Sequence, residues 1–348
     1  MENKKKTIFN IIFLIALFLI TIYIMFHGQD LASIIDKLGQ VRKRFLLIGV
    51  LLVIVFVCCE SVIIKYLLHV VKIKWPLYRC IRYSFIGFFF SCITPSATGG
   101  QPAQIYYMKK EGLDIPTSTI ILLLVTIEYK FVLVFIGLGL ILFGQPIVQM
   151  LSTEVQFYLY LGLALNVFCV VFMSFLVFLP NTSRFLMQKL YAILGKLHIM
   201  KNLDKKLIKL EHSMDQYQAA SVFLKKNKPA IFNVFIISLI QRLILFFVTY
   251  IVYCSFGLHG HSALEITILQ ATISIAVDML PLPGGMGISE HLFKRIFVPI
   301  FAGSINLTLS AMLLSRGISY YALVLISALV TFYSHLTIGK TKTKGRTS

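Results

Sequence analysis

The chain is poor in charged residues and poorest in acidic ones. Only 14% of its 348 residues are charged, and 33 Lys and Arg stand against 14 Asp and Glu. Soluble domains carry about a quarter charged residues, so this composition excludes a soluble globular domain. Hydrophobic residues make up 58% of the chain and occur in runs long enough to cross a bilayer. We therefore expect an all-α, polytopic integral membrane protein.

The chain also lacks the short motifs that mark common catalytic and metal sites. It contains no H-E-x-x-H, G-x-S-x-G or Walker-type sequence, and its six cysteines show no C-x-x-C spacing. All six cysteines lie in apolar runs, which predicts reduced thiols rather than disulfides. The histidines of His259-Gly260-His261 could bind a metal, but two histidines in a loop are usually just solvated. We expect no catalytic residue, no metal and no cofactor.

Apolar runs predict six full spans and two hairpins of short helices. The expected spans cover residues 8–26, 45–68, 118–143, 157–179, 230–254 and 308–336. Two further segments, 77–110 and 263–303, each have the length of two short helices and must begin and end on one side of the membrane. We expect the first hairpin to enter from the cytoplasm and the second from outside.

Basic residues are confined to some of the connections, and this sets the expected topology. Residues 180–229 contain ten Lys and Arg against three acids, and the tail from residue 340 contains four more and no acid. Connections 144–156 and 255–265 contain neither Lys nor Arg. The positive-inside rule places the two basic regions in the cytoplasm. It predicts a multi-pass protein of the cell membrane with both termini cytoplasmic.

The net charge of +19 fits attraction to anionic lipid at the cytoplasmic face rather than nucleic-acid binding. Basic residues in separate loops form no groove, whereas each one near an anionic surface contributes about 1 kcal/mol. One stretch fits badly, because an expected outside connection contains Lys37, Arg42, Lys43 and Arg44. Amphipathic spacing over 30–44 predicts a helix along the interface. If that stretch is cytoplasmic, the account of the first span is wrong.

Both hairpins are broken at their centres by proline and paired glycines. The breaks read Thr94-Pro95-Ser96-Ala97-Thr98-Gly99-Gly100-Gln101-Pro102 and Pro281-Leu282-Pro283-Gly284-Gly285-Met286-Gly287. Lipid cannot satisfy backbone groups that leave a helix, so such breaks must pack in protein or line a polar cavity. A pair of interrupted segments, one in each half of a membrane protein, is typical of a transporter's binding site.

The order span, hairpin, span occurs twice and in opposite directions, at 45–143 and 230–336. We expect residues 1–348 to form a single transmembrane domain of two inverted halves. The basic, amphipathic stretch 180–229 is the expected cytoplasmic linker between them. Inverted repeats of this kind place a substrate site near the midplane.

Ionisable residues inside apolar segments cost about 2.5–3.5 kcal/mol each on insertion scales, so they normally face a cavity or a partner. The candidates are Glu60, Glu128, Arg242, Asp278, Glu290 and Arg316. In one interpretation, Glu128–Arg242 or Asp278–Arg316 form structural ion pairs, and Glu290 pairs with Lys294 one turn on. In the other, the arginines receive a phosphate, and the helix N-termini after the glycines add oriented N–H groups.

The candidate substrate-binding set combines the breaks with these charges. It comprises Gly99, Gly100, Gln101, Glu128, Arg242, Asp278, Gly284, Gly285, Glu290 and Arg316. For one Gly-Gly alone, a kink that serves only packing is the simpler interpretation, whereas two at matching positions favour a site. The last span also presents a polar face, because polar residues recur there at helical spacing: Tyr320, Ser327, Thr331 and Ser334.

These segments resemble a known family. The first break followed by Glu128, together with Pro283-Gly284-Gly285-Met286-Gly287-Ile288-Ser289-Glu290 and Arg316-Gly317-Ile318-Ser319-Tyr320-Tyr321, resembles the transmembrane part of lysylphosphatidylglycerol synthases, the MprF-type flippase-like family. The resemblance covers almost the whole chain. Three positions depart from the family pattern: Gln101 stands where an acid is common, and Gln104 and Ser289 stand where Arg is common.

The resemblance implies a lipid flippase that moves an aminoacylated or otherwise modified anionic phospholipid between leaflets. The alternative is a phosphatidylglycerol lysyltransferase, or its membrane subunit working with a separate synthase, linked to resistance against cationic antimicrobial peptides. In the family an extra cytosolic domain makes the lysylated lipid from lysyl-tRNA. The longest polar stretch here, 180–229, is too short for such a domain. A third interpretation is a scaffold whose broken helices only kink.

Overall fold

A computed structural model describes residues 38–94, 97–179, 225–280, 285 and 287–338, and isolated residues at 36, 184–185, 189, 215, 217–218 and 221–222. Every regular element among these residues is a helix. The expected span 8–26 and most of the linker 180–229 lie outside the described residues, as does Gly284.

Five long helices are apolar enough to cross a bilayer. They are α3 (Lys43–Val70), α6 (Ile115–Phe143), α8 (Thr153–Phe178), α11 (Lys228–Ser255) and a last helix made of α14 (Ile305–Arg316), η3 (Gly317–Ala322) and α15 (Leu323–Ile338). Each begins within a few residues of its predicted start. The prediction of a polytopic, all-helical membrane protein is confirmed.

Polar caps and prolines fix where several of these helices begin. The Asp114 carboxylate accepts a hydrogen bond from the Thr117 backbone N–H at 2.9 Å, and Pro116 occupies the first turn of α6. Ser152 and Ser304 cap α8 and α14 in the same way. These side chains satisfy backbone donors that the first helical turn leaves without a partner. The apolar runs between such caps then propagate as helix.

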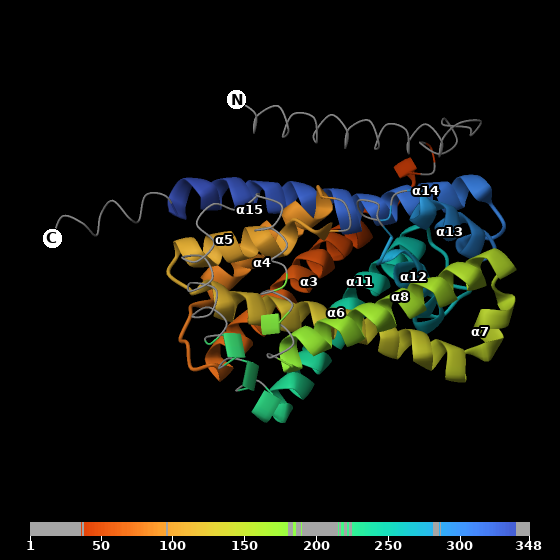
Figure 1. The fold of residues 1–348 in the computed structure, drawn as a ribbon. Helices are drawn as coiled ribbons and strands as arrows, with labels where there is room; N and C mark the ends of the chain where they lie inside the picture. The colour runs from red at the N-terminus through yellow and green to blue at the C-terminus, as the bar shows by residue number, and fades with distance from the viewer. Residues whose placement is uncertain are drawn as a thin grey trace.

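The two predicted hairpins are present. α4 (Leu77–Cys92) and α5 (Gly100–Lys110) form the first, and α12 (Ala263–Val277) and α13 (Ile288–Phe297) form the second. Figure 1 shows α4 and α5 in one half of the bundle and α12 and α13 in the other, so the hairpins enter from opposite ends. The orientation in the membrane and the two inverted halves stay predictions.

Buried apolar side chains form two clusters, one around each hairpin. One cluster joins α4 and α5 to the adjoining halves of α3 and α6. The other joins α12 and α13 to α8, α14 and the opposite halves of α3, α6 and α11. The two hairpins are thus packed largely in separate apolar clusters.

Two features of the connections were not predicted. A short helix, α7 (Gln145–Met150), follows α6 and lies at the end of the bundle where the second hairpin enters (Figure 1). The last long helix contains the π-helical segment η3, which directly follows Arg316.

The basic stretch at 42–44 lies at the same end as the 256–262 connection, because the Arg42 N–H donates to the Ser255 carbonyl at 3.2 Å.

Candidate functional site

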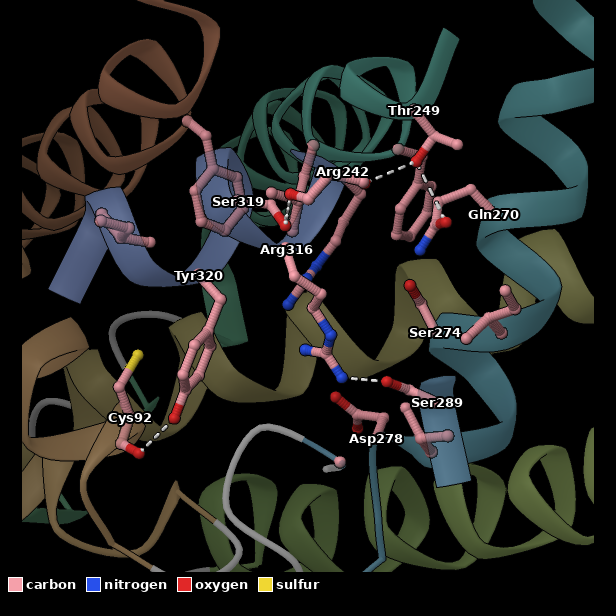
Figure 2. Close-up of a pocket in the computed structure, with 18 of the residues that line it drawn as sticks. Cys92, Arg242, Thr249, Gln270, Ser274, Asp278, Ser289, Arg316, Ser319 and Tyr320 are labelled. Atoms are coloured by element: carbon pink, nitrogen blue, oxygen red, sulfur yellow. Dashed lines mark hydrogen bonds between the residues drawn. The ribbon is translucent and has the colours of Figure 1, made fainter. Parts of the chain in front are cut away.

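The two hairpins end at a cavity of about 280 Å³. Residues at both hairpin ends line it, together with residues of α3, α6, α11 and the last long helix. The lining residues include Cys92 and Ala97 from the first hairpin. They include Asp278, Gly285 and Ser289 from the second. Arg242 of α11 and Arg316 of the last helix reach into the same space (Figure 2). The sequence prediction of a polar site between the broken helices has a physical counterpart here.

Arg242 is a buried cation whose guanidinium lacks full hydrogen bonding. It lies halfway along α11, its residue is 3% exposed, and its Nε and Nη2 atoms have no hydrogen-bond partner. The guanidinium stacks on the ring of Tyr129 and lies 5.7 Å from the ring centre of Phe56. Aromatic ring faces attract the cation, but they accept no hydrogen bonds from its N–H groups, which lie in the plane of the guanidinium. The cation is therefore only partly satisfied by the described protein groups, and its side chain belongs to the cavity wall.

Asp278 is held by two residues of α6. Its Oδ2 atom lies 2.7 Å from the Lys130 ammonium, and its Oδ1 atom accepts a hydrogen bond from the Tyr129 hydroxyl at 2.9 Å. Asp278 follows the last turn of α12, so this pair joins the second hairpin to α6. Both carboxylate oxygens are occupied, and the pair carries no net charge when both groups are ionised.

Glu290 closes the N-terminus of α13 and also binds the last helix. Its Oε2 atom accepts from the Gly287 backbone N–H at 2.6 Å, and its Oε1 atom lies 2.9 Å from Nε of Arg316. Arg316 also donates to the Ser289 hydroxyl. Gly287 has φ +86°, a conformation that only glycine adopts readily, and it turns the chain so that Glu290 can reach back. The positive end of this half-helix is thus already capped by a carboxylate.

The last long helix contacts both hairpin ends within two turns. Arg316 binds the start of α13, and the Tyr320 hydroxyl donates to the carbonyl of Cys92, the last residue of α4, at 2.8 Å. Both residues flank or belong to η3. π-helical segments are rare and occur frequently at functional sites, because the wider turn re-aims side chains. Here the segment lets one helix meet the ends of two hairpins.

Neutral polar groups complete the cavity wall. The Thr249 hydroxyl donates to the Gln270 amide oxygen at 3.0 Å and contacts the Ser315 hydroxyl at 3.3 Å. Figure 2 shows the amide nitrogen of Gln270 and the hydroxyl of Ser274 on the side of the two arginines. These groups can donate to or accept from a ligand that also contacts a guanidinium.

Three of the predicted site residues pack the first hairpin instead of lining the cavity. A Cβ atom on Gly100 would lie 2.8 Å from the Gly87 carbonyl oxygen, and one on Gly99 would lie 2.6 Å from Cγ2 of Thr94. Gln101 donates to the Leu122 carbonyl and to Thr126 on α6. For this hairpin the packing interpretation of the glycines has the geometric support.

Two carboxylates of α3 and α6 lie away from the cavity wall. Glu128 is 5% exposed and has no hydrogen bond or ion pair with any described residue. Glu60 accepts a hydrogen bond from the Gln104 amide at 2.8 Å and lies within electrostatic range of Arg242 without bonding it. Gln104 is thus a neutral donor to Glu60.

The predicted ion pairs are wrong. Glu128 does not pair with Arg242, and Asp278 does not pair with Arg316, because Lys130 binds Asp278 and Glu290 binds Arg316. The predicted Glu290–Lys294 pair is likewise replaced by the pair with Arg316. Sequence reasoning did not include Lys130 among the candidate residues. Its position halfway along α6 was the signal that could have placed it in the interior.

The polar face predicted on the last helix is buried, but most of it lies outside the cavity. Ser327, Thr331 and Ser334 are buried, and their hydroxyls have no hydrogen-bond partner within the described parts of the chain. Only Tyr320 of the predicted set lines the cavity. Small polar residues allow helices to approach closely in a membrane. For the three others we therefore infer a packing role.

The comparisons with known proteins agree with this architecture. The family model for the lysylphosphatidylglycerol synthase TM region matches residues 11–327, most of the chain. No curated protein matches the chain. The matched region contains every residue of the cavity described above. The chain therefore belongs to the lysylphosphatidylglycerol synthase TM family.

Proposed function

We propose that this protein is a phospholipid carrier that moves a headgroup between leaflets through the cavity at the hairpin ends. The observation that carries the proposal is Arg242, a buried cation with two guanidinium nitrogens that have no hydrogen-bond partner. A charge without a partner inside a membrane destabilises the protein, so such a charge is retained where an anion binds. Guanidinium matches the oxygens of a phosphate better than any other side chain does.

The size of the cavity favours a headgroup rather than a whole lipid. A volume of about 280 Å³ lies just below the range for small-molecule pockets, which starts at about 300 Å³. A headgroup with its phosphate fits that space, whereas acyl chains would remain in the surrounding bilayer. Alternating exposure of the two hairpins to the two faces would carry the headgroup across while its tails stay in lipid.

The proposed setting is the cell membrane, with both termini and the 180–229 linker in the cytoplasm. The basic residues of the linker and the tail support this orientation and would hold the cytoplasmic face against anionic lipid. The proposed lipid class, from the family name, is a modified anionic or aminoacylated phospholipid similar to lysylphosphatidylglycerol. A carrier of that lipid would take part in resistance to cationic antimicrobial peptides.

The second candidate is a phosphatidylglycerol lysyltransferase, or the membrane subunit of one that works with a separate synthase. The observation that favours it is the synthase name of the family. A transferase would need a free base or an activated nucleophile beside its substrate, whereas the carboxylate of the cavity, Asp278, is already bound to Lys130 and Tyr129. The two candidates predict different lipid distributions and can be separated in cells.

Leaflet-resolved lipid analysis in cells with and without the protein tests the proposal. A carrier leaves the total amount of each phospholipid unchanged and lowers the outer-leaflet share of its substrate when it is deleted. An enzyme lowers the total amount of its product. Complementation with Arg242→Gln should fail, and complementation with Arg295→Gln, an exposed arginine paired with Glu154, should succeed. Normal lipid distribution with Arg242→Gln would overturn the proposal.

A further inference from the structure

The end of the molecule where the first hairpin enters carries basic and aromatic side chains on two neighbouring segments. Residues 72–82 join α3 to α4 and form the first turns of α4, and residues 106–111 end α5. Together they contain six cations, here called the basic cluster: Lys72, Lys74, Arg79, Arg82, Lys109 and Lys110. No residue of these two fully described segments lines the cavity, so this surface is separate from the site described above.

One network of polar contacts holds the two segments together. Nη2 of Arg82 lies 2.6 Å from Oε1 of Glu111, and the Tyr83 hydroxyl donates to the other oxygen of the same carboxylate. The indole N–H of Trp75 in turn donates to the Tyr83 hydroxyl at 3.2 Å. All four side chains are buried or half-buried. The network therefore fixes the Trp75 ring and the end of α5 in one arrangement.

Aromatic rings on both segments support the cations without neutralising them. The Arg79 guanidinium lies 4.9 Å from the ring centre of Trp75 and 5.9 Å from that of Tyr78. The Lys110 ammonium lies 4.6 Å from the ring centre of Tyr106. Tyr78 and Tyr106 are 58% and 50% exposed. Tryptophan and tyrosine are enriched where membrane meets water, so these rings mark the level of the lipid headgroups.

The acids of this region do not balance the cluster. Glu111 is held by Arg82 and Tyr83, and it acts on Arg79 only at longer range. The next acid along the chain, Asp114, caps the start of α6. Within the described parts of the chain, four members of the cluster form no ion pair: Lys74, Arg79, Lys109 and Lys110. Six cations against two acids leave this surface positively charged.

We infer that the basic cluster is a docking site for the phosphate of an anionic phospholipid, in the leaflet at this end of the bundle. Arg79 supplies the guanidinium fork that matches phosphate oxygens, and Lys74 and Lys110 add positive charge. The exposed rings of Tyr78 and Tyr106 lie against the same headgroup layer. The docked lipid is a neighbour held at the base of the first hairpin, whatever lipid the cavity receives.

Two observations favour a lipid over a soluble anion. The cluster stands at the ends of helices whose next turns are apolar, so its cations lie beside a bilayer. The exposed tyrosines add an amphipathic surface that a soluble phosphate would not use. Each basic residue near an anionic membrane surface strengthens binding about fivefold. The preference for anionic over zwitterionic lipid should therefore be measurable.

The fluorescence of Trp75 tests the inference, because this residue is the only tryptophan of the chain. The purified full-length protein is titrated in neutral detergent with phosphatidylglycerol or phosphatidylcholine whose acyl chains carry bromine, which quenches a tryptophan ring on contact. Half-quenching should need at least about fivefold less phosphatidylglycerol than phosphatidylcholine. High salt should reduce this difference. Equal quenching by the two lipids at low salt overturns the inference, without any variant.

A competition arm identifies the source of the phosphate. Soluble glycerophosphoglycerol carries the same headgroup without acyl chains, and at the concentration of the brominated lipid it should leave the quenching unchanged. If it displaces the lipid at equal concentration, the site binds a free phosphodiester and the lipid assignment is overturned.

Variants locate the docking site. Arg79→Gln should weaken the preference for phosphatidylglycerol about fivefold, and adding Lys110→Gln should weaken it further by a similar factor. Arg44→Gln is the matched control, because Arg44 is an exposed arginine 5.2 Å from the ring centre of Phe45 at the opposite end of α3. It should behave as wild type does. An unchanged preference in the folded double variant overturns the assignment to this cluster.

The inference and the proposed function can fail separately. A protein whose Trp75 is quenched preferentially by phosphatidylglycerol but that moves no lipid in vesicles supports the docking site and refutes the carrier. A protein that moves lipid while both brominated lipids quench equally supports the carrier and refutes the docking site.

Discussion

The two hairpins arise from similar patterns of proline and paired glycine, but their breaks are stabilised in different ways. In the first, Thr94 donates to the Phe90 carbonyl at 2.6 Å and accepts from the Gly99 N–H at 2.9 Å, so the turn is closed by its own side chain. Its glycines allow α5 to press against α4. In the second, Gly285 and Gly287 adopt positive φ, and Glu290 ties the half-helix to Arg316.

The difference indicates that a broken helix in a membrane serves either packing or ligand contact. The first hairpin contributes Phe88, Ser91, Cys92 and Ala97 to the cavity wall and no charged residue, whereas the second contributes Asp278 together with Gly285 and Ser289. Paired glycines in a sequence predict the break in both cases. What they do there depends on how closely the neighbouring helix approaches, and that is a tertiary property.

Removing the cation that holds the second hairpin should have the largest effect. Arg316→Gln leaves Glu290 buried without its ionic partner, which costs about 3–5 kcal/mol of stability. Thermal unfolding in detergent measures the loss. The double variant Arg316→Gln with Glu290→Gln should recover most of the stability but no lipid transport. Full stability of the single variant would show that the pair does not hold the hairpin.

The first hairpin should respond most strongly to added volume. Gly100→Ala places a methyl group 2.8 Å from the Gly87 carbonyl oxygen, which cannot move aside without displacing α4. We expect a loss of about 3 kcal/mol, at the upper end for overpacking. Gly139→Ala in α6 is the matched control, because nothing lies within 4 Å of its added Cβ. Equal thermal stability of the two variants would remove the packing role of Gly100.

In the second hairpin, a substitution of glycine should act through backbone conformation rather than through added side-chain volume. Gly287 has φ +86°, and an added Cβ would meet nothing within 4 Å. Gly287→Ala should therefore cost about 1–2 kcal/mol through strain alone. Because the strain displaces Glu290, it should also lower transport more than Gly100→Ala does at matched amounts of folded protein. The reverse order of transport rates would contradict the comparison.

The smallest effect is expected at the contact between the last helix and the first hairpin. Tyr320→Phe removes one hydrogen bond to the Cys92 carbonyl and should cost about 1 kcal/mol. Hydrogen exchange of the backbone at the end of α4 should rise in this variant and stay unchanged at the start of α13. A rise at both hairpin ends would mean that they open together rather than separately.

The placement of the helices could be predicted from the sequence because the signals are local. The length of the apolar runs predicted the described spans, and the Pro-Gly clusters predicted the break in each hairpin. The pairing of charges could not be predicted, since it depends on the rotation of each helix and on relative depth in the bundle. Lys130 and Asp278 meet although they lie 148 residues apart. The π-helical turn after Arg316 has no sequence signal comparable to a proline.

The central claim is that Arg242 provides the charge that binds a lipid phosphate in a cavity between two oppositely directed hairpins. Its most direct test is translocation of fluorescently labelled phosphatidylglycerol across vesicles that contain the purified protein. The account predicts transport by wild type and by Arg295→Gln, and loss of transport by Arg242→Gln at equal amounts of folded protein. Wild-type transport rates in the Arg242→Gln vesicles would contradict it.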